Sequence, residues 1–156
     1  MDLRQLRGFL REERSALGLF GSVRGRALTA TLALLALGCG ADRYIVLGTA
    51  RAPSTAGYVE ASSAGGSSTD VRVHMEALHP VDSLDPALHA YVVWFEHDQR
   101  PPLRAGSLRY KPDERLGELQ AKAPFRKFVV KITAEANDKP KAPSEFIVAT
   151  QEIAID

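Results

Sequence analysis

Residues 127–135 read KFVVKITAE, and the order of apolar and polar side chains in this stretch decides the fold class. Successive side chains of a β-strand point to opposite faces of its sheet, so apolar residues at every second position predict a strand with one buried face. The apolar positions are Phe128, Val130, Ile132 and Ala134, and the polar ones are Lys131, Thr133 and Glu135. We therefore expect the first set to line a core and the second set to face solvent.

Strand-like patterns recur along the chain. Residues 88–97, LHAYVVWFEH, are apolar on both sides in the middle, which is typical of a central strand. Residues 70–78 repeat the alternation, with Val71, Val73, Met75 and Ala77 against Arg72, His74 and Glu76. Other candidates are RYIVLGTA (43–50), GYVEA (57–61), AGSLRY (105–110), GELQAK (117–122) and EFIVATQEIAI (145–155). The last changes its apolar phase between Val148 and Ile153, which predicts a β-bulge.

Segments rich in Gly, Pro, Ser, Asn and Asp separate these stretches, and such residues favour turns. After residue 50 the only helical signal is one short turn within VDSLDPALH, residues 81–89. Seven or eight short strands spaced by turns are typical of an antiparallel β-sandwich. The sequence thus predicts an all-β domain over residues 39–156.

The N-terminal part has a different character. Residues 27–40, ALTATLALLALGCG, contain no charged side chain and follow Arg24 and Arg26, which is the layout of a secretory signal peptide. Fourteen residues of helix would reach about 21 Å, short of the ~30 Å of a bilayer core. We expect residues 1–38 to form a helical leader with a signal peptide. Residues 1–22 are long for its first part, so they are either an amphipathic surface helix or precede a true translation start at Val23.

The end of this leader, LALGC, resembles the lipobox of bacterial lipoproteins. Gly38 matches the small residue before the cleavage site, and Cys39 matches the cysteine that is diacylated. Leu37 and Ala36 depart from the usual pattern, which has Leu three places before the cysteine. Cys39 is also the chain's one cysteine, so no disulfide explains it. The resemblance implies a lipid anchor at Cys39 and a place in the bacterial cell envelope, facing the periplasm or exterior; a leader retained as an anchor is the alternative.

A second resemblance concerns the domain. The domain is similar to the extracytoplasmic domain of anti-sigma-K-type factors in four stretches: YVVWF (91–95), RAGSLRY (104–110), APFRKFVVKITAE (123–135) and APSE (142–145). That resemblance implies an immunoglobulin-like sandwich outside the membrane. Such factors also have a cytoplasmic sigma-binding domain and a spanning helix, for which this chain has no room. We therefore do not expect it to sequester a sigma factor itself.

Charge and chemistry exclude several function classes. Residues 1–38 have six Arg against three acidic side chains, a charge of +3, and the remainder has 14 basic against 16 acidic side chains, a charge of −2. A domain at −2 lacks the positive surface that nucleic acids require, so we expect no nucleic-acid partner. The four histidines, His74, His79, His89 and His97, show no helical metal-site spacing. We expect no metal, no cofactor and no catalysis.

A non-catalytic domain acts by binding, and loops at strand ends are the common place for it. Our candidate surface combines the segment after residues 88–95 with the loop over residues 137–144. The candidate residues are Glu96, His97, Asp98, Gln99, Arg100, Lys139 and Lys141. Trp94 is expected in the core, as in immunoglobulin-like domains. On the opposite face from Tyr91, Val93 and Phe95, it would instead mark an exposed binding surface.

The sequence therefore predicts a lipid-anchored interaction module of the cell envelope that binds a protein or polymer partner. The alternative is a sensory or regulatory accessory lipoprotein, related to the outer domain of anti-sigma factors.

Overall fold

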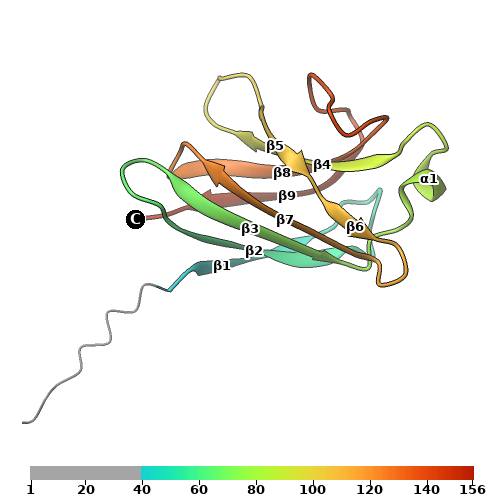
Figure 1. Cartoon of the computed structure of the whole chain (residues 1–156), viewed down its shortest axis with the longest axis horizontal. Helices are drawn as coiled ribbons and strands as arrows, with labels where there is room; N and C mark the ends of the chain where they lie inside the picture. The colour runs from blue at the N-terminus through green and yellow to red at the C-terminus, as the bar shows by residue number, and fades with distance from the viewer. Residues whose placement is uncertain (1–39) are drawn as a thin grey trace, which may run out of the picture. The chain divides into compact units, whose positions relative to one another are not determined.

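The computed structural model describes residues 40–156, which form a sandwich of two antiparallel β-sheets (Figure 1). The strand order is β1-β2-β3-β7-β6 in one sheet and β5-β4-β8-β9 in the other. The elements are β1 (Asp42–Leu47), β2 (Ala56–Ser63), β3 (Thr69–Glu76), α1 (Val81–Leu84), β4 (Ala90–Glu96), β5 (Leu103–Ser107), β6 (Arg109–Lys111), β7 (Leu116–Ala123), β8 (Lys127–Glu135) and β9 (Ile147–Ala154). The predicted leader and the lipid site at Cys39 lie outside the described residues.

The predicted all-β sandwich is confirmed, and its strand order is immunoglobulin-like. An immunoglobulin domain pairs strands ABED in one sheet and CFG in the other. Here β2-β3-β7-β6 take the first order and β4-β8-β9 the second, while β1 and β5 add one edge strand to each sheet. Within residues 40–156, no helix has the length and apolar character needed to cross a membrane.

The described residues form nine strands because one predicted strand is divided between the sheets. The stretch AGSLRY was expected as one strand, but β5 ends at Ser107 in the four-stranded sheet and β6 begins at Arg109 in the five-stranded sheet. Leu108, between them, is buried in the core. The predicted bulge is confirmed: Ile132 and Thr133 are consecutive on β8 but pair with Ala149 and Ile147, which leaves Val148 as the extra residue on β9.

The core lies between the two sheets and follows the period of two. Both predicted apolar sets contribute to it, and β4 adds a third. The core residues from these three strands are Val71, Val73 and Met75 from β3, Tyr91, Val93 and Phe95 from β4, and Phe128, Val130, Ile132 and Ala134 from β8.

Trp94 is buried, as expected, but it lies outside the cluster between the two sheets, so that part of the expectation is wrong. It lies on the opposite face of β4 from Tyr91, Val93 and Phe95, facing away from the second sheet, yet its exposed fraction is only 1%. The alternative, an exposed binding surface, is wrong as well. Something must therefore cover this outer face.

The cover is the segment of residues 136–146, which joins β8 to β9. The carbonyl oxygen of Asp138 accepts hydrogen bonds from Arg104 Nη1 (3.2 Å) and Ser107 Oγ (2.9 Å), both on β5. In Figure 1 this red-orange segment rises beyond the four-stranded sheet, on the side away from the other sheet. Thr133 and Glu135, expected to face solvent, are 0% and 4% exposed beneath it.

Candidate binding surface on the five-stranded sheet

Polar side chains occupy the outer face of the five-stranded sheet and remain partly exposed. The outer face of the other sheet is buried around Trp94 and Thr133, and its partly exposed ion pairs lie toward the start of β8, where Lys131 pairs with Glu96.

On β3 the exposed fraction alternates along the strand, with Arg72, His74 and Glu76 pointing outward. Strand pairing places Glu60 of β2 and Gln120 of β7 on either side of Arg72. It likewise places β2 and β7 side chains on either side of His74, so the polar residues form rows across the strands.

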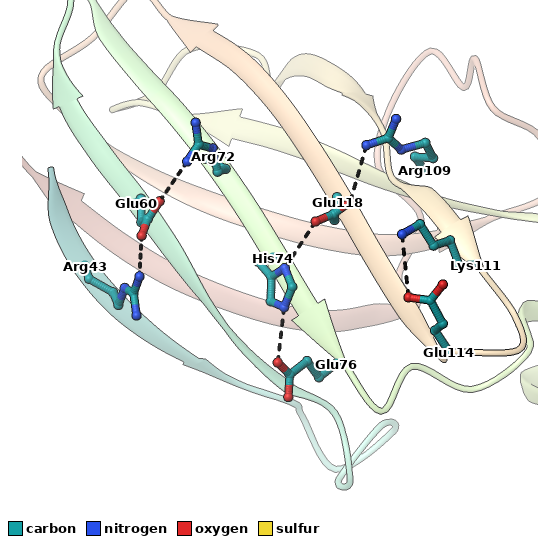
Figure 2. Close-up of polar contacts among 9 residues, drawn as sticks. All are labelled: Arg43, Glu60, Arg72, His74, Glu76, Arg109, Lys111, Glu114 and Glu118. Carbon is teal, nitrogen blue, oxygen red and sulfur yellow. Dashed lines mark hydrogen bonds and ion pairs between the residues drawn. The ribbon is translucent and has the colours of Figure 1, made fainter.

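The first row centres on Glu60, which lies between two arginines (Figure 2). Arg43 pairs with one of its carboxylate oxygens, and Arg72 Nη1 lies 3.3 Å from the other. The hydrogen bond from Arg43 lowers the pKa of Glu60, and this effect outweighs burial, which raises it. The pKa of Arg43 is raised in turn by the same hydrogen bond. Glu60 is therefore held as an anion between two cations.

The second row centres on His74, whose two ring nitrogens face two carboxylates (Figure 2). Nε2 lies 3.1 Å from Glu76 Oε1, and Nδ1 lies 3.5 Å from Glu118 Oε1. The ring stacks on Tyr58 with centroids 4.8 Å apart. Arg109 Nη2 lies 3.3 Å from the second oxygen of Glu118. This row is an ordered alternation of basic and acidic groups.

Burial raises the pKa of the Glu118 carboxyl, but the hydrogen bond from Arg109 and the charge of Lys111 lower it more, so the net shift is downward. Lys111 also lies 3.5 Å from Glu114 at the end of this row. Glu118 is thus an anion at neutral pH.

Two hollows open on this face, and both adjoin the first row. One of about 370 Å³ is lined by residues of β2, β3 and β7, and one of about 460 Å³ by residues of β3, β5, β6 and β7. Arg72 and Gln120 line both. Their donors, with those of Arg109 in the second hollow, suit a polar ligand and not an apolar one.

No family model, no curated protein and no solved structure matches this chain. The candidate site is therefore defined by the geometry of residues 40–156 alone.

The two loops proposed from the sequence do not form one surface, so their combination was wrong. Because β4 and β8 are antiparallel, Glu96 pairs with Val129 near the start of β8, whereas Ala90 pairs with Glu135 at its end. The loop after β4 and the loop after β8 consequently extend from opposite ends of the sheet.

Within the loop after β4, several candidate residues make internal contacts. His97 Nδ1 lies 2.7 Å from the carbonyl oxygen of Lys127, and its Nε2 lies 2.9 Å from Asp98 Oδ2. Its ring stacks on Phe125 at 4.3 Å. Glu96 accepts a hydrogen bond from Lys131 Nζ at 2.6 Å. These contacts hold the loop in place, and the Asp98 side chain remains 75% exposed.

The remaining candidates are exposed. Gln99 and Arg100 lie in the loop after β4, and Lys139 and Lys141 in the loop after β8. The guanidinium of Arg100 lies 5.9 Å from the Phe125 ring centroid. Among residues 40–156, no group of three or more His, Cys, Asp or Glu side chains is placed to hold a metal ion.

Sequence reasoning missed the polar rows because they depend on strand pairing. The alternation over residues 70–78 correctly placed Arg72, His74 and Glu76 on one face. Nothing in the sequence showed that Glu60 and Glu118, from distant strands, would become their partners.

Proposed function

We propose that this chain is a lipid-tethered, non-catalytic module of the bacterial cell envelope, and that it binds a protein or polymer partner through the outer face of its five-stranded sheet. The observation that supports this surface is the difference between the two outer faces. Residues 136–146 cover the part of the four-stranded sheet around Trp94 and Thr133, whereas the polar rows around Glu60 and His74 stay accessible. Ordered charged groups around open hollows suit a partner that brings its own polar groups.

The proposed tether limits which surfaces a partner can reach. Strand β1 begins at Asp42, three residues after Cys39, and three extended residues span at most about 10 Å. A lipid on Cys39 would hold the nearby end of the sandwich close to the bilayer. That end includes the loop after β4. Tyr44 of β1 donates a hydrogen bond to the Ala154 carbonyl oxygen at the end of β9, which pairs with the start of β8, and β4 ends beside the start of β8. The loop after β8, with Lys139 and Lys141, lies at the other end.

The experiment that tests the surface is crosslinking in cells from a photoreactive amino acid at Gln120. Gln120 is exposed between the two hollows, and no ion pair is lost when it is replaced. We expect capture of one defined partner from position 120, and loss of that capture when Arg72 and Arg109 are both changed to Gln. Lys127→Gln, which removes an exposed cation of β8 in the other sheet, is the matched control and should leave capture intact.

Two further positions make the result decisive. The same photoreactive group at Asp98 tests the loop after β4, and at Lys141 the loop after β8. Capture from either loop position but not from Gln120 would show that the sheet face is the wrong surface.

The tether has its own test, intact-mass spectrometry of protein extracted from membranes. The expected species begins at Cys39 and has the added mass of lipid, and Cys39→Ser should abolish that species. A mature chain with an unmodified Cys39 thiol would refute the lipid anchor, whatever the crosslinking shows.

A further inference from the structure

Strand β1 has two of the three exposed large hydrophobic side chains of the described domain. Residues 40–156 contain three exposed large hydrophobic side chains: Ile45 (64%), Leu47 (69%) and Leu103 (43%). Two of them lie on this one strand of six residues, which begins three residues after Cys39. Water contact with large aliphatic groups is unfavourable, so a pair of them beside a proposed membrane anchor calls for a physical explanation.

The two side chains point in the same direction. On the outer face, Ile45 pairs with Tyr58 and Leu47 pairs with Ala56, both on β2. The small side chain of Ala56 leaves Leu47 without a large neighbour across the strands. Arg43 pairs with Glu60 one position earlier on that face, and its guanidinium lies 4.2 Å from the Tyr58 ring centroid.

We propose that these four residues, Arg43, Ile45, Leu47 and Tyr58, lie against the surface of the lipid bilayer. We name them the β1 strip. The proposal rests on the membrane tether of the proposed function, because a tether of about 10 Å keeps β1 within reach of the bilayer. The bilayer is then the one apolar phase always available to Ile45 and Leu47.

The chemistry of the β1 strip suits the zone between lipid headgroups and acyl chains. Aliphatic side chains enter the edge of the acyl region, whereas Tyr and Arg place an apolar body beside a polar tip that reaches the headgroups. Two carboxylates lie beside the strip on this face, and both have partners. Glu60 pairs with Arg43, and Glu76, opposite Ala56, lies 3.1 Å from His74. The hollows around Arg72 and Gln120 are lined mainly by strands beyond β1, which leaves that part of the face for a partner.

The same tether permits a second orientation, in which the sandwich stands on its end. That orientation would bring Leu103 and the loop after β4 to the bilayer and keep Leu47 in water. Leu103, the third exposed hydrophobic residue, is therefore the matched comparison for Leu47.

The test places an environment-sensitive fluorescent amino acid at position 47, 103 or 141 of the full chain, reconstituted into vesicles of phosphatidylethanolamine and phosphatidylglycerol. Brominated lipids then quench a probe that lies in the bilayer, and iodide quenches one that lies in water. We expect a blue-shifted emission at position 47 that brominated lipids quench, with iodide quenching at 103 and 141. A probe at position 45 repeats the measurement if replacement of Leu47 disturbs the fold.

Each other outcome overturns the proposal. Lipid quenching at 103 but not at 47 means the end-on orientation. A blue-shifted probe at 47 that neither quencher reaches means that protein, such as a second copy, covers the β1 strip. Intact-mass spectrometry of the same sample tests the tether separately. If the chain is lipidated but iodide quenches the probe at position 47, the tether stands and only the proposal for the β1 strip is refuted.

Discussion

The indole Nε1 of Trp94 donates a hydrogen bond to Thr133 Oγ1 at 2.9 Å, on the face of the four-stranded sheet that points away from the sandwich core. Thr133 in turn donates to the carboxylate of Glu135, which also accepts a hydrogen bond from the backbone nitrogen of Ser144 at 2.8 Å. This chain of bonds connects the sheet to the covering segment, residues 136–146. A buried tryptophan, a threonine and a carboxylate thus form a second, polar core outside the first.

Thr133→Val tests that polar core. Valine has nearly the shape of threonine but neither accepts from Trp94 nor donates to Glu135, so buried polar groups lose partners. We expect a loss of about 1–3 kcal/mol in the free energy of unfolding, measured by urea titration. Thr150→Val, at an exposed position of β9, should change it by less than about 0.5 kcal/mol. Equal effects of the two changes would refute the role given to Thr133.

Releasing the covering segment should expose Trp94 without unfolding the domain. Arg104 and Ser107 both donate to the carbonyl oxygen of Asp138, so changing both to Ala removes two bonds that hold residues 136–146. Because Trp94 is the chain's one tryptophan, its fluorescence reports on this site alone. We expect stronger acrylamide quenching in the double variant and no change in Arg100→Ala. Quenching that stays at the wild-type level would mean that other contacts hold the segment.

Ile132→Ala should destabilise the sandwich core. Ile132 is fully buried, so the cost in the free energy of unfolding is about 2–5 kcal/mol, from lost burial and the remaining cavity. Lys131→Ala is the comparison: the sequence alone places Lys131 toward solvent, where its loss would cost little free energy of unfolding. Its ammonium group lies 2.6 Å from Glu96, and both side chains are less than one third exposed, so we now expect a loss of about 1 kcal/mol. Chemical denaturation of both variants measures the difference.

Tyr91 should make stability fall at alkaline pH. Burial raises the pKa of its hydroxyl well above the ordinary value of about 10, and the nearby Tyr110 acts in the same direction. Above pH 10 the unfolded chain loses this proton while the folded chain keeps it, so the contribution of Tyr91 is complete below pH 10 and decreases as pH rises, by up to about 1.4 kcal/mol per pH unit.

Tyr91→Phe isolates this effect. The hydroxyl donates to the carbonyl oxygen of His79 at 2.8 Å, so its loss should cost about 1 kcal/mol at pH 8. The stability difference between wild type and variant, from urea unfolding at pH 8 to 11, should narrow above pH 10. A constant difference across that range would show that Tyr91 ionises normally in the folded domain.

The sequence by itself determined the fold class and most strands, because strands are local and their side chains alternate with a period of two. Val71, Val73 and Ile132 could be assigned to a core from their neighbours alone, and the phase change after Val148 indicated the bulge. Where one set of alternate side chains on a strand is apolar and the other is polar, the apolar set faces the core.

Only the tertiary structure decided the rest, for two physical reasons. Around Trp94 both faces of β4 are apolar, so alternation gave the two sets of side chains but not which set faces the other sheet. The partners of Glu60, His74 and Lys131 come from strands distant in the chain, and pairing across strands depends on register and sheet order. The same long-range topology sent the two candidate loops to opposite ends and folded residues 136–146 over a face that the local pattern had assigned to solvent.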